Sequence, residues 1–485
     1  MVRIPMVVAL FCLVVYPSAL RCENFQTNLP SLAELAEDER ALETEFQAIV
    51  DQKPKSIREG KLGEPSEIED QAIKKWLSAV SKFHEKYDEY NERKMDFVME
   101  RYLGIATEME ADVLQSEVYT AEQKKLISQK LESLKGKYIR AQENKGNLGR
   151  PNDRERSIAI NNFLNEMEKF SDVVRKPQRT LKDKWKDASR SLLINVQKLA
   201  AAGAAILNIP TMAVAYFRNG KVLDTLKPLA KTLVWAQGKN MTLKGRENLP
   251  TETPSGTLNF YALMHAHNLY DFAGLAELGS RKAAILSAFT VPKLKNWMEN
   301  ADDFVIVRGS TKNPLSTILP KIKSETINGL YIFPEGSLGA YGYETRPAQQ
   351  SMGILFKLLK KEGINVRVIP VAMPQNAQLL VKVKDGNSSI DPRELHTIVG
   401  KPLEPDLVAK LMELGDRQTI GQMIRQSWME AQVSDMGTER ILGMPPLPQL
   451  VQAMDEKMGS STGCNQWFAK MGTKYPTQVR VSYPQ

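Results

Sequence analysis

Cysteine and histidine are scarce in this chain of 485 residues, which has three cysteines and four histidines. The cysteines, Cys12, Cys22 and Cys464, stand far apart and form neither a metal-binding cluster nor a disulfide framework. No group of histidines and carboxylates has the spacing of metal ligands either. We therefore expect a protein that needs no metal and no other cofactor.

Motifs for nucleic-acid binding are absent, although the chain is basic, with 65 lysines and arginines against 57 aspartates and glutamates and a net charge of +8. Such an excess suits nucleic acid, an anionic membrane surface, or phosphorylated and CoA-like substrates. The sequence has no zinc finger, helix-turn-helix or aromatic RNA-binding signature. We therefore expect no nucleic-acid partner, which leaves membranes and phosphorylated substrates.

The first region of the chain, residues 1–22, has Arg3 followed by an apolar run from Ile4 to Leu20. This pattern indicates an export signal peptide. No clean cleavage site follows the run, so the alternative is a signal anchor close to the minimum length of a membrane span. Both alternatives direct the chain to a membrane or beyond it, and the side of the membrane stays open.

Residues 23–190 are rich in Glu, Lys, Ala, Leu and Gln, with few glycines and prolines inside long stretches. In one stretch the apolar residues recur every three or four positions, as in Ile73, Trp76, Val80 and Phe83. This spacing predicts amphipathic helices, which we expect at residues 32–50, 67–103, 120–142 and 158–174. We interpret the region as a helical arm or bundle whose charged runs form solvated faces.

Residues 191–445 differ from the helical region before them in their pattern of apolar residues. The first part, residues 191–217, is the most apolar stretch after the N-terminus, and it predicts either membrane-interfacial helices or a buried core helix. From about residue 230 short apolar runs alternate with helical ones, which predicts an α/β domain with a mainly parallel sheet. The expected strands are residues 283–289, 303–309, 329–336 and 366–373.

Helical patterns return near the C-terminus, over residues 351–363 and 404–442. The first of these predicts a basic amphipathic helix. The final segment, residues 446–485, is rich in Pro, Gly and Ser, and we expect a loosely packed tail.

Two of the four histidines, His265 and His267, lie one residue apart and are followed by Asp271. Four-residue spacing places His267 and Asp271 on one face of a helix. A carboxylate bonded to one imidazole nitrogen fixes the tautomer and leaves the other nitrogen free to accept a proton. The segment is therefore a candidate general base for deprotonating a hydroxyl group.

Polar residues also lie at the ends of two of the expected strands. Glu335 lies at the end of one strand, next to Gly336 and Ser337, and Arg308 lies at the end of another. Ligands of open α/β sheets bind at the carboxyl ends of the strands. An arginine there can hold a phosphate through paired hydrogen bonds.

These motifs, in this order over roughly residues 250–375, resemble the glycerolipid and phospholipid acyltransferases typified by 1-acylglycerol-3-phosphate acyltransferase. HAHNLYD stands where that family has a His-x-x-x-x-Asp block, and FVIVRGS, with Arg308, looks like the second block. YIFPEGS, with Glu335, looks like the third block, and VRVIPVAM, with Pro370, looks like the fourth.

The chain departs from the family in the first block. Three residues separate His267 from Asp271 and five separate His265 from Asp271, where the family has four. The sequence favours His267 as the base, with His265 reaching from one turn back as the other arrangement. The His-His-x-x-x-Asp-Gly motif of the carnitine- and chloramphenicol-type acyltransferases fits less well, because residue 266 is Ala and no Gly follows Asp271 directly.

A second departure follows the third block, where Leu338 occupies the position at which the family usually has an arginine. Either Lys312 or Arg346 supplies the missing charge, or the acceptor lacks the phosphate that such an arginine helps to bind. The residues that the resemblance implies for substrate binding are Arg308, Glu335, Gly336, Ser337 and Arg346.

The resemblance implies an acyltransferase-like α/β fold and an O-acyltransferase of phospholipid biosynthesis that works at a membrane surface. The donor would be acyl-CoA or acyl carrier protein, and the acceptor would be a hydroxyl of glycerol phosphate or of a lysophospholipid. His267, oriented by Asp271, would be the base, with His265 as the other candidate. The alternative is a catalytically impaired acyltransferase-like protein that binds lipid or acts as a scaffold.

Overall fold

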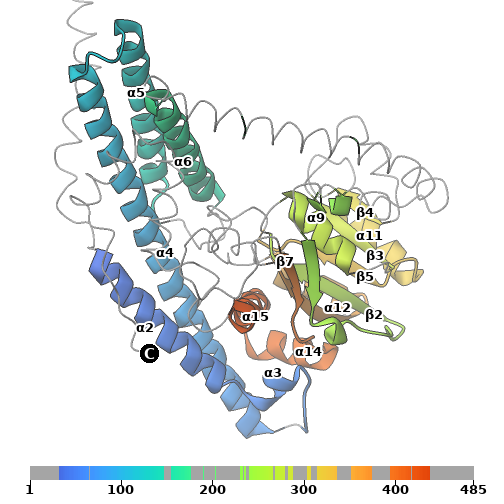
Figure 1. Ribbon diagram of the computed structural model, residues 1–485. Coiled ribbons are helices and arrows are strands. Elements are labelled where there is room, and N and C mark those ends of the chain that lie inside the picture. Colours follow the sequence, from blue (N-terminus) through green and yellow to red (C-terminus); the bar gives the residue numbers. More distant parts are fainter. Residues whose placement is uncertain are drawn as a thin grey trace, which may run out of the picture.

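The computed structural model describes residues 32–64, 66–146, 154–175, 240–265, 268–278, 282–287, 303–306, 314–335, 351–373, 394–416 and 418–436, together with a few isolated positions. Among these residues, helices form the N-terminal part, and a sheet with flanking helices forms the part from residue 240 onward (Figure 1). The expected combination of an α/β fold and a helical N-terminal region is therefore confirmed.

The strands of the sheet lie in the order β1-β7-β6-β2-β5-β3-β4. Their bounds are Asn240–Lys244 (β1), Thr257–Leu263 (β2), Ala283–Ser287 (β3), Phe304–Ile306 (β4), Gly329–Ile332 (β5), Asn365–Ala372 (β6) and Glu394–Val399 (β7). Neighbouring strands are parallel except β6 and β7, so the expectation of a mainly parallel sheet is also confirmed. Each of the four expected strands is present, while β1, β2 and β7 had not been expected.

Strand β2 lies at the centre of the sheet, and all seven of its residues are buried. It is parallel to both of its neighbours, with Ala262 opposite Ile332 of β5 and Pro370 of β6. The carboxyl ends of these strands consequently meet at one edge of the sheet. Residues that follow β2 and β5 in the chain are brought together there.

Helices cover both faces of the sheet. Pro314–Lys323 (α11), Ser351–Lys361 (α12), Pro405–Leu414 (α14) and Thr419–Met436 (α15) contribute to one apolar core, which also contains Leu258 and Phe260 of β2. Asn268–Glu277 (α9) packs on the other face, where Tyr261 and Leu263 of β2 belong to a second core. Alternate residues of β2 therefore anchor both layers.

The arm consists of the helices Leu32–Asp51 (α2), Lys55–Glu59 (α3), Glu67–Gln115 (α4), Ala121–Glu143 (α5) and Arg154–Arg175 (α6). The long helix α4 runs along the whole arm; α2 packs beside its first half, and α5 and α6 pack beside its second half (Figure 1). The expected apolar face of α4 is confirmed, because Ile73, Trp76, Val80 and Phe83 are all buried.

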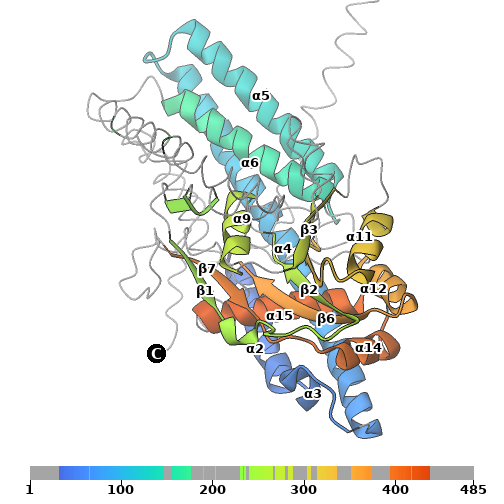
Figure 2. The ribbon, with the colours of Figure 1, turned by 90° about the vertical axis from the view of Figure 1, so that its right-hand side faces the viewer.

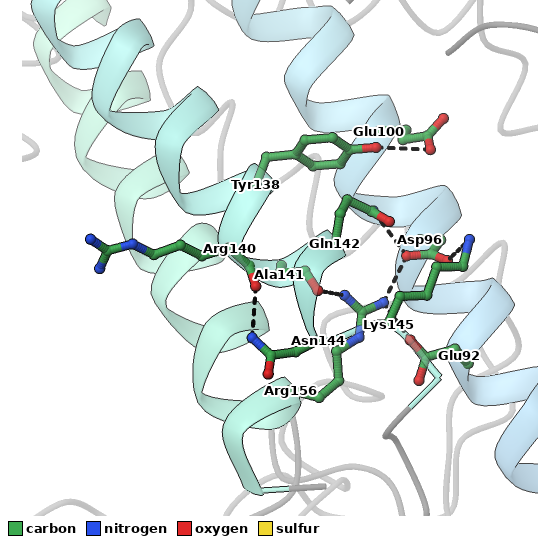
Figure 3. Close-up of polar contacts among 10 residues, drawn as sticks. All are labelled: Glu92, Asp96, Glu100, Tyr138, Arg140, Ala141, Gln142, Asn144, Lys145 and Arg156. Atoms are coloured by element: carbon green, nitrogen blue, oxygen red, sulfur yellow. Dashed lines mark hydrogen bonds and ion pairs between the residues drawn. The ribbon is translucent and has the colours of Figure 1, made fainter. Parts of the chain in front are cut away.

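A buried ionic cluster joins α4, α5 and α6 (Figure 3). The fully buried guanidinium of Arg156 lies 2.6 Å from a Glu92 oxygen and 2.7 Å from an Asp96 oxygen. It also donates a hydrogen bond to the carbonyl of Ala141 near the end of α5. Lys145 approaches the other Asp96 oxygen to 2.7 Å. Two carboxylates can stay buried here because two cations neutralise them.

Helix α15 connects the arm to the sheet. It lies between α4 and the strands (Figure 1), and Figure 2 shows it across the sheet behind β6. Three polar pairs join it to α4, namely Gln422 with Ser81, Gln426 with His84, and Arg425 with Asp88. The arm is thus packed against the α/β part rather than standing apart from it.

The expected N-terminal signal or anchor (1–22) and the tail (446–485) lie outside the described residues, as does 191–217 apart from an isolated position. Of the helices that the structure does describe, none combines the length and the apolar character required to cross a membrane.

Replacing the buried cation of the arm gives a first prediction. Arg156→Met should lower the free energy of unfolding by about 3 kcal/mol, because it leaves Glu92 and Asp96 buried with fewer cations. Denaturant unfolding followed by circular dichroism measures the change. Lys169→Met, which removes an exposed cation from the same helix, is the control and should have little effect. Equal stabilities of the two variants would contradict a buried role for Arg156.

The interface between the arm and α15 gives a second prediction, on pH. Burial, and then the charge of Arg425, hold the pKa of His84 well below its ordinary value of 6.5. The unfolded chain therefore binds the proton more readily, so His84 contributes stability above about pH 6.5 that is lost as the pH falls.

His84→Gln keeps a donor for Gln426 and has no titrating group. Its melting temperature should fall less than that of the wild type between about pH 8 and about pH 5. The partly exposed His396 of β7 supplies the control, His396→Gln. A fall in His84→Gln as steep as in the wild type would show that His84 does not titrate on unfolding.

Candidate active site

The candidate site begins where β2 ends. The chain leaves the strand at Leu263, passes through Met264 and His265, and enters α9 at Asn268. Asp271 lies in the first turn of that helix, where the positive end of the helix dipole favours a carboxylate. A strand followed closely by a helix N-terminus therefore supplies both members of a histidine–carboxylate pair.

The imidazole of His265 pairs with Asp271. Its Nδ1 lies 2.6 Å from Oδ2 of Asp271, whose side chain is only 2% exposed, whereas the His265 side chain is 20% exposed. An ionised carboxylate only accepts hydrogen bonds. The proton therefore resides on Nδ1, and this N–H donates a hydrogen bond to Asp271. Nε2 is then the basic nitrogen of a ring that is partly open to solvent.

This pairing differs from the arrangement that the sequence favoured. The first described residue of α9 is Asn268, and His265 lies before the helix in the segment that follows β2. The pair therefore joins the segment after β2 to the first turn of α9 instead of sharing a helical face. His267, the favoured partner, lies outside the described residues, so the structure assigns it no position.

Glu335 lies at the same edge of the sheet, three residues beyond β5. Its Oε2 accepts a hydrogen bond of 2.7 Å from the backbone N–H of His265, and the residue is 4% exposed. The ring of Phe333 lies 4.8 Å from the His265 ring, at 42° between the planes. Residues of the segment YIFPEGS thus contact both the backbone and the ring of His265.

Helix α15 supports the same strand end. The indole N–H of Trp428 donates to the carbonyl of Ala262 at 3.0 Å, and the side-chain amide of Gln432 lies 2.8 Å from the sulfur of Met264. The sequence predicted a helix here but did not identify these contacts. The signal in the sequence is the spacing of Trp428 and Gln432, four residues apart on one face of the expected helix. Two side chains with polar groups on that face could have indicated polar partners.

The remaining residues expected at the site, Arg308, Gly336, Ser337 and Arg346, lie outside the described residues. The structure therefore brings together His265, Asp271 and Glu335 of the predicted set. In the part of the chain that it describes, no three His, Cys, Asp or Glu side chains are arranged to hold a metal ion.

Comparisons with protein families, with curated proteins and with solved structures gave no match for this chain. The function is therefore inferred from the geometry of the site. A histidine with one nitrogen bonded to a buried carboxylate and the other nitrogen available is suited to general-base chemistry on a hydroxyl group.

Replacing the carboxylate tests the assigned tautomer. In Asp271→Asn the amide no longer enforces a proton on Nδ1, so the ring nitrogen signals of His265 should shift toward a mixture of tautomers. Nitrogen NMR of histidine-labelled protein measures this, with the signal assigned through His265→Gln. Glu277→Gln on the same helix is the control, since Glu277 pairs with Lys231 instead. An unchanged His265 spectrum in Asp271→Asn would contradict the pairing.

Proposed function

We propose that this chain is a membrane-associated O-acyltransferase that moves a fatty acyl group from an acyl thioester to a hydroxyl group. The donor is acyl-CoA or acyl carrier protein, and the acceptor is glycerol phosphate or a lysophospholipid. The observation that carries the proposal is the His265–Asp271 pair, held at the carboxyl ends of β2 and β5 by Glu335 of the FPEGS motif.

His265 is the base in this proposal. Its Nε2 accepts the proton of the acceptor hydroxyl while the hydroxyl oxygen attacks the thioester carbonyl. The tetrahedral oxyanion then collapses, the carbon–sulfur bond breaks, and the sulfur leaves as a thiol with the proton from the imidazolium. Asp271 stabilises the imidazolium between these two steps. The products are an ester and a free thiol, so no further reactant is required.

Membrane association and the substrate class rest on the sequence. The net charge of +8 and the apolar stretches near residues 4–20 and 191–217 favour a lipid surface. Arg308 and Arg346 are proposed to hold the acceptor phosphate, with Gly336 and Ser337 supporting it.

Acyl transfer by the purified full-length chain tests the function. Oleoyl-CoA is the donor; the acceptors are glycerol 3-phosphate, and lysophosphatidate in phospholipid vesicles. Release of free thiol and formation of the ester are measured together. His265→Ala should lower kcat by a factor of about 100 or more, the ordinary contribution of a general base. His267→Ala is the matched control and should retain most of the activity.

The reverse ranking of the two variants would make His267 the base and overturn the assignment of His265. Full activity in both variants would contradict a histidine base. If the wild-type chain binds the vesicles but transfers no acyl group to either acceptor, the enzyme proposal fails and a lipid-binding scaffold takes its place.

A further inference from the structure

A buried arginine of α15 holds this helix to the arm. The side chain of Arg425 is 3% exposed and forms two hydrogen bonds with the carboxylate of Asp88 on α4, one of them 2.9 Å long. Its guanidinium also lies 5.2 Å from the centre of the Tyr87 ring. The fork geometry of a guanidinium on a carboxylate fixes orientation as well as charge.

Burial acts to lower the pKa of Arg425, but Asp88, followed by Tyr87 and Glu335, raises it above its ordinary value. The guanidinium is therefore charged, as the buried ion pair with Asp88 requires.

The same face of α15 holds the strand that carries His265. Arg425, Trp428 and Gln432 are three and four residues apart in sequence, and so project from one side of the helix. The Trp428 indole bonds the carbonyl of Ala262, and the Gln432 amide contacts Met264, the residue directly before His265. A shift of α15 would move both supports of the His265 backbone together.

We propose that Arg425 is a positioning residue of the candidate site and that Asp88 of the arm holds it in place. The arm thereby fixes the placement of α15, whose Trp428 and Gln432 hold the strand end that carries His265. This inference rests on the proposed function for its effect on activity, but not for its effect on the His265 environment.

Asp88→Asn is the test variant, because it removes the negative charge of the arm with little change in shape. The charged fork between Arg425 and Asp88 is then lost, so α15 can shift and move the Trp428 and Gln432 supports of the strand end before His265. We expect kcat to fall roughly 10- to 100-fold with little change in KM, as for a misplaced catalytic group. Asp88→Glu restores the charge and should recover much of kcat.

Asp70→Asn is a closely matched control. Asp70 also lies on α4 and pairs with a cation of the α/β part, Lys410 of α14, at 2.6 Å. The same substitution there removes another ion pair between α4 and the α/β part, at a residue that pairs with α14 rather than α15. Its kcat should equal that of the wild type, and thermal melting must show each variant folded at the assay temperature.

A second readout separates the inference from the proposed function. Nitrogen NMR of the histidine rings should show a shifted His265 signal in Asp88→Asn and an unshifted one in Asp70→Asn, whether or not the chain transfers acyl groups. If Asp88→Asn does not fold, Arg425→Lys replaces it, since lysine keeps the charge but lacks the fork.

An unshifted His265 signal in Asp88→Asn, or equal losses of kcat in Asp88→Asn and Asp70→Asn, would overturn the inference. A shifted signal together with an inactive wild type would uphold the inference and reject only the proposed function.

Discussion

The parallel pairing of β2 with β5 is the constraint on which the candidate site depends. Because the two strands run side by side in the same direction, the chain segments beyond them leave the sheet at the same edge. His265 follows one strand and Glu335 follows the other, and a hydrogen bond of 2.7 Å joins them. Asp271 then needs only the start of α9 to reach the imidazole. Residues 70 positions apart in the sequence therefore meet at this edge.

Burial of charge shapes both the site and its junction with the arm. Glu335 and Asp271 are both nearly inaccessible to solvent, and a buried carboxylate requires a compensating group. Asp271 pairs with the imidazole of His265, and Glu335 accepts the backbone N–H of the same residue. At the junction, the carboxylate of Asp88 on α4 pairs with the buried guanidinium of Arg425 on α15. The Arg156 cluster, which begins one turn farther along α4 at Glu92, follows the same rule.

Much of the fold was predictable because its elements have regular patterns. The long arm helices repeat apolar residues every three or four positions, and β3 to β6 are short apolar runs bounded by glycine, proline or charge. Strand β2 escaped prediction because it is buried on both faces, so its sequence has no alternation that separates a strand from a buried helix. Strand β1 is short and lies at the edge of the sheet, where few contacts shape its sequence.

The site was predictable in its residue types but not in its pairing. The order of the motifs placed His265, Asp271 and Glu335 in one group, whereas the choice between the two histidines depends on where α9 begins. Tertiary contacts hold the residues before it, since Met264 bonds to Val371 of β6 and His265 to Glu335. Arg425 was beyond sequence reasoning for a related reason, because its partner Asp88 lies 337 positions away. Local spacing identifies candidate groups, but the register of neighbouring strands and the burial of charge decide which of them meet.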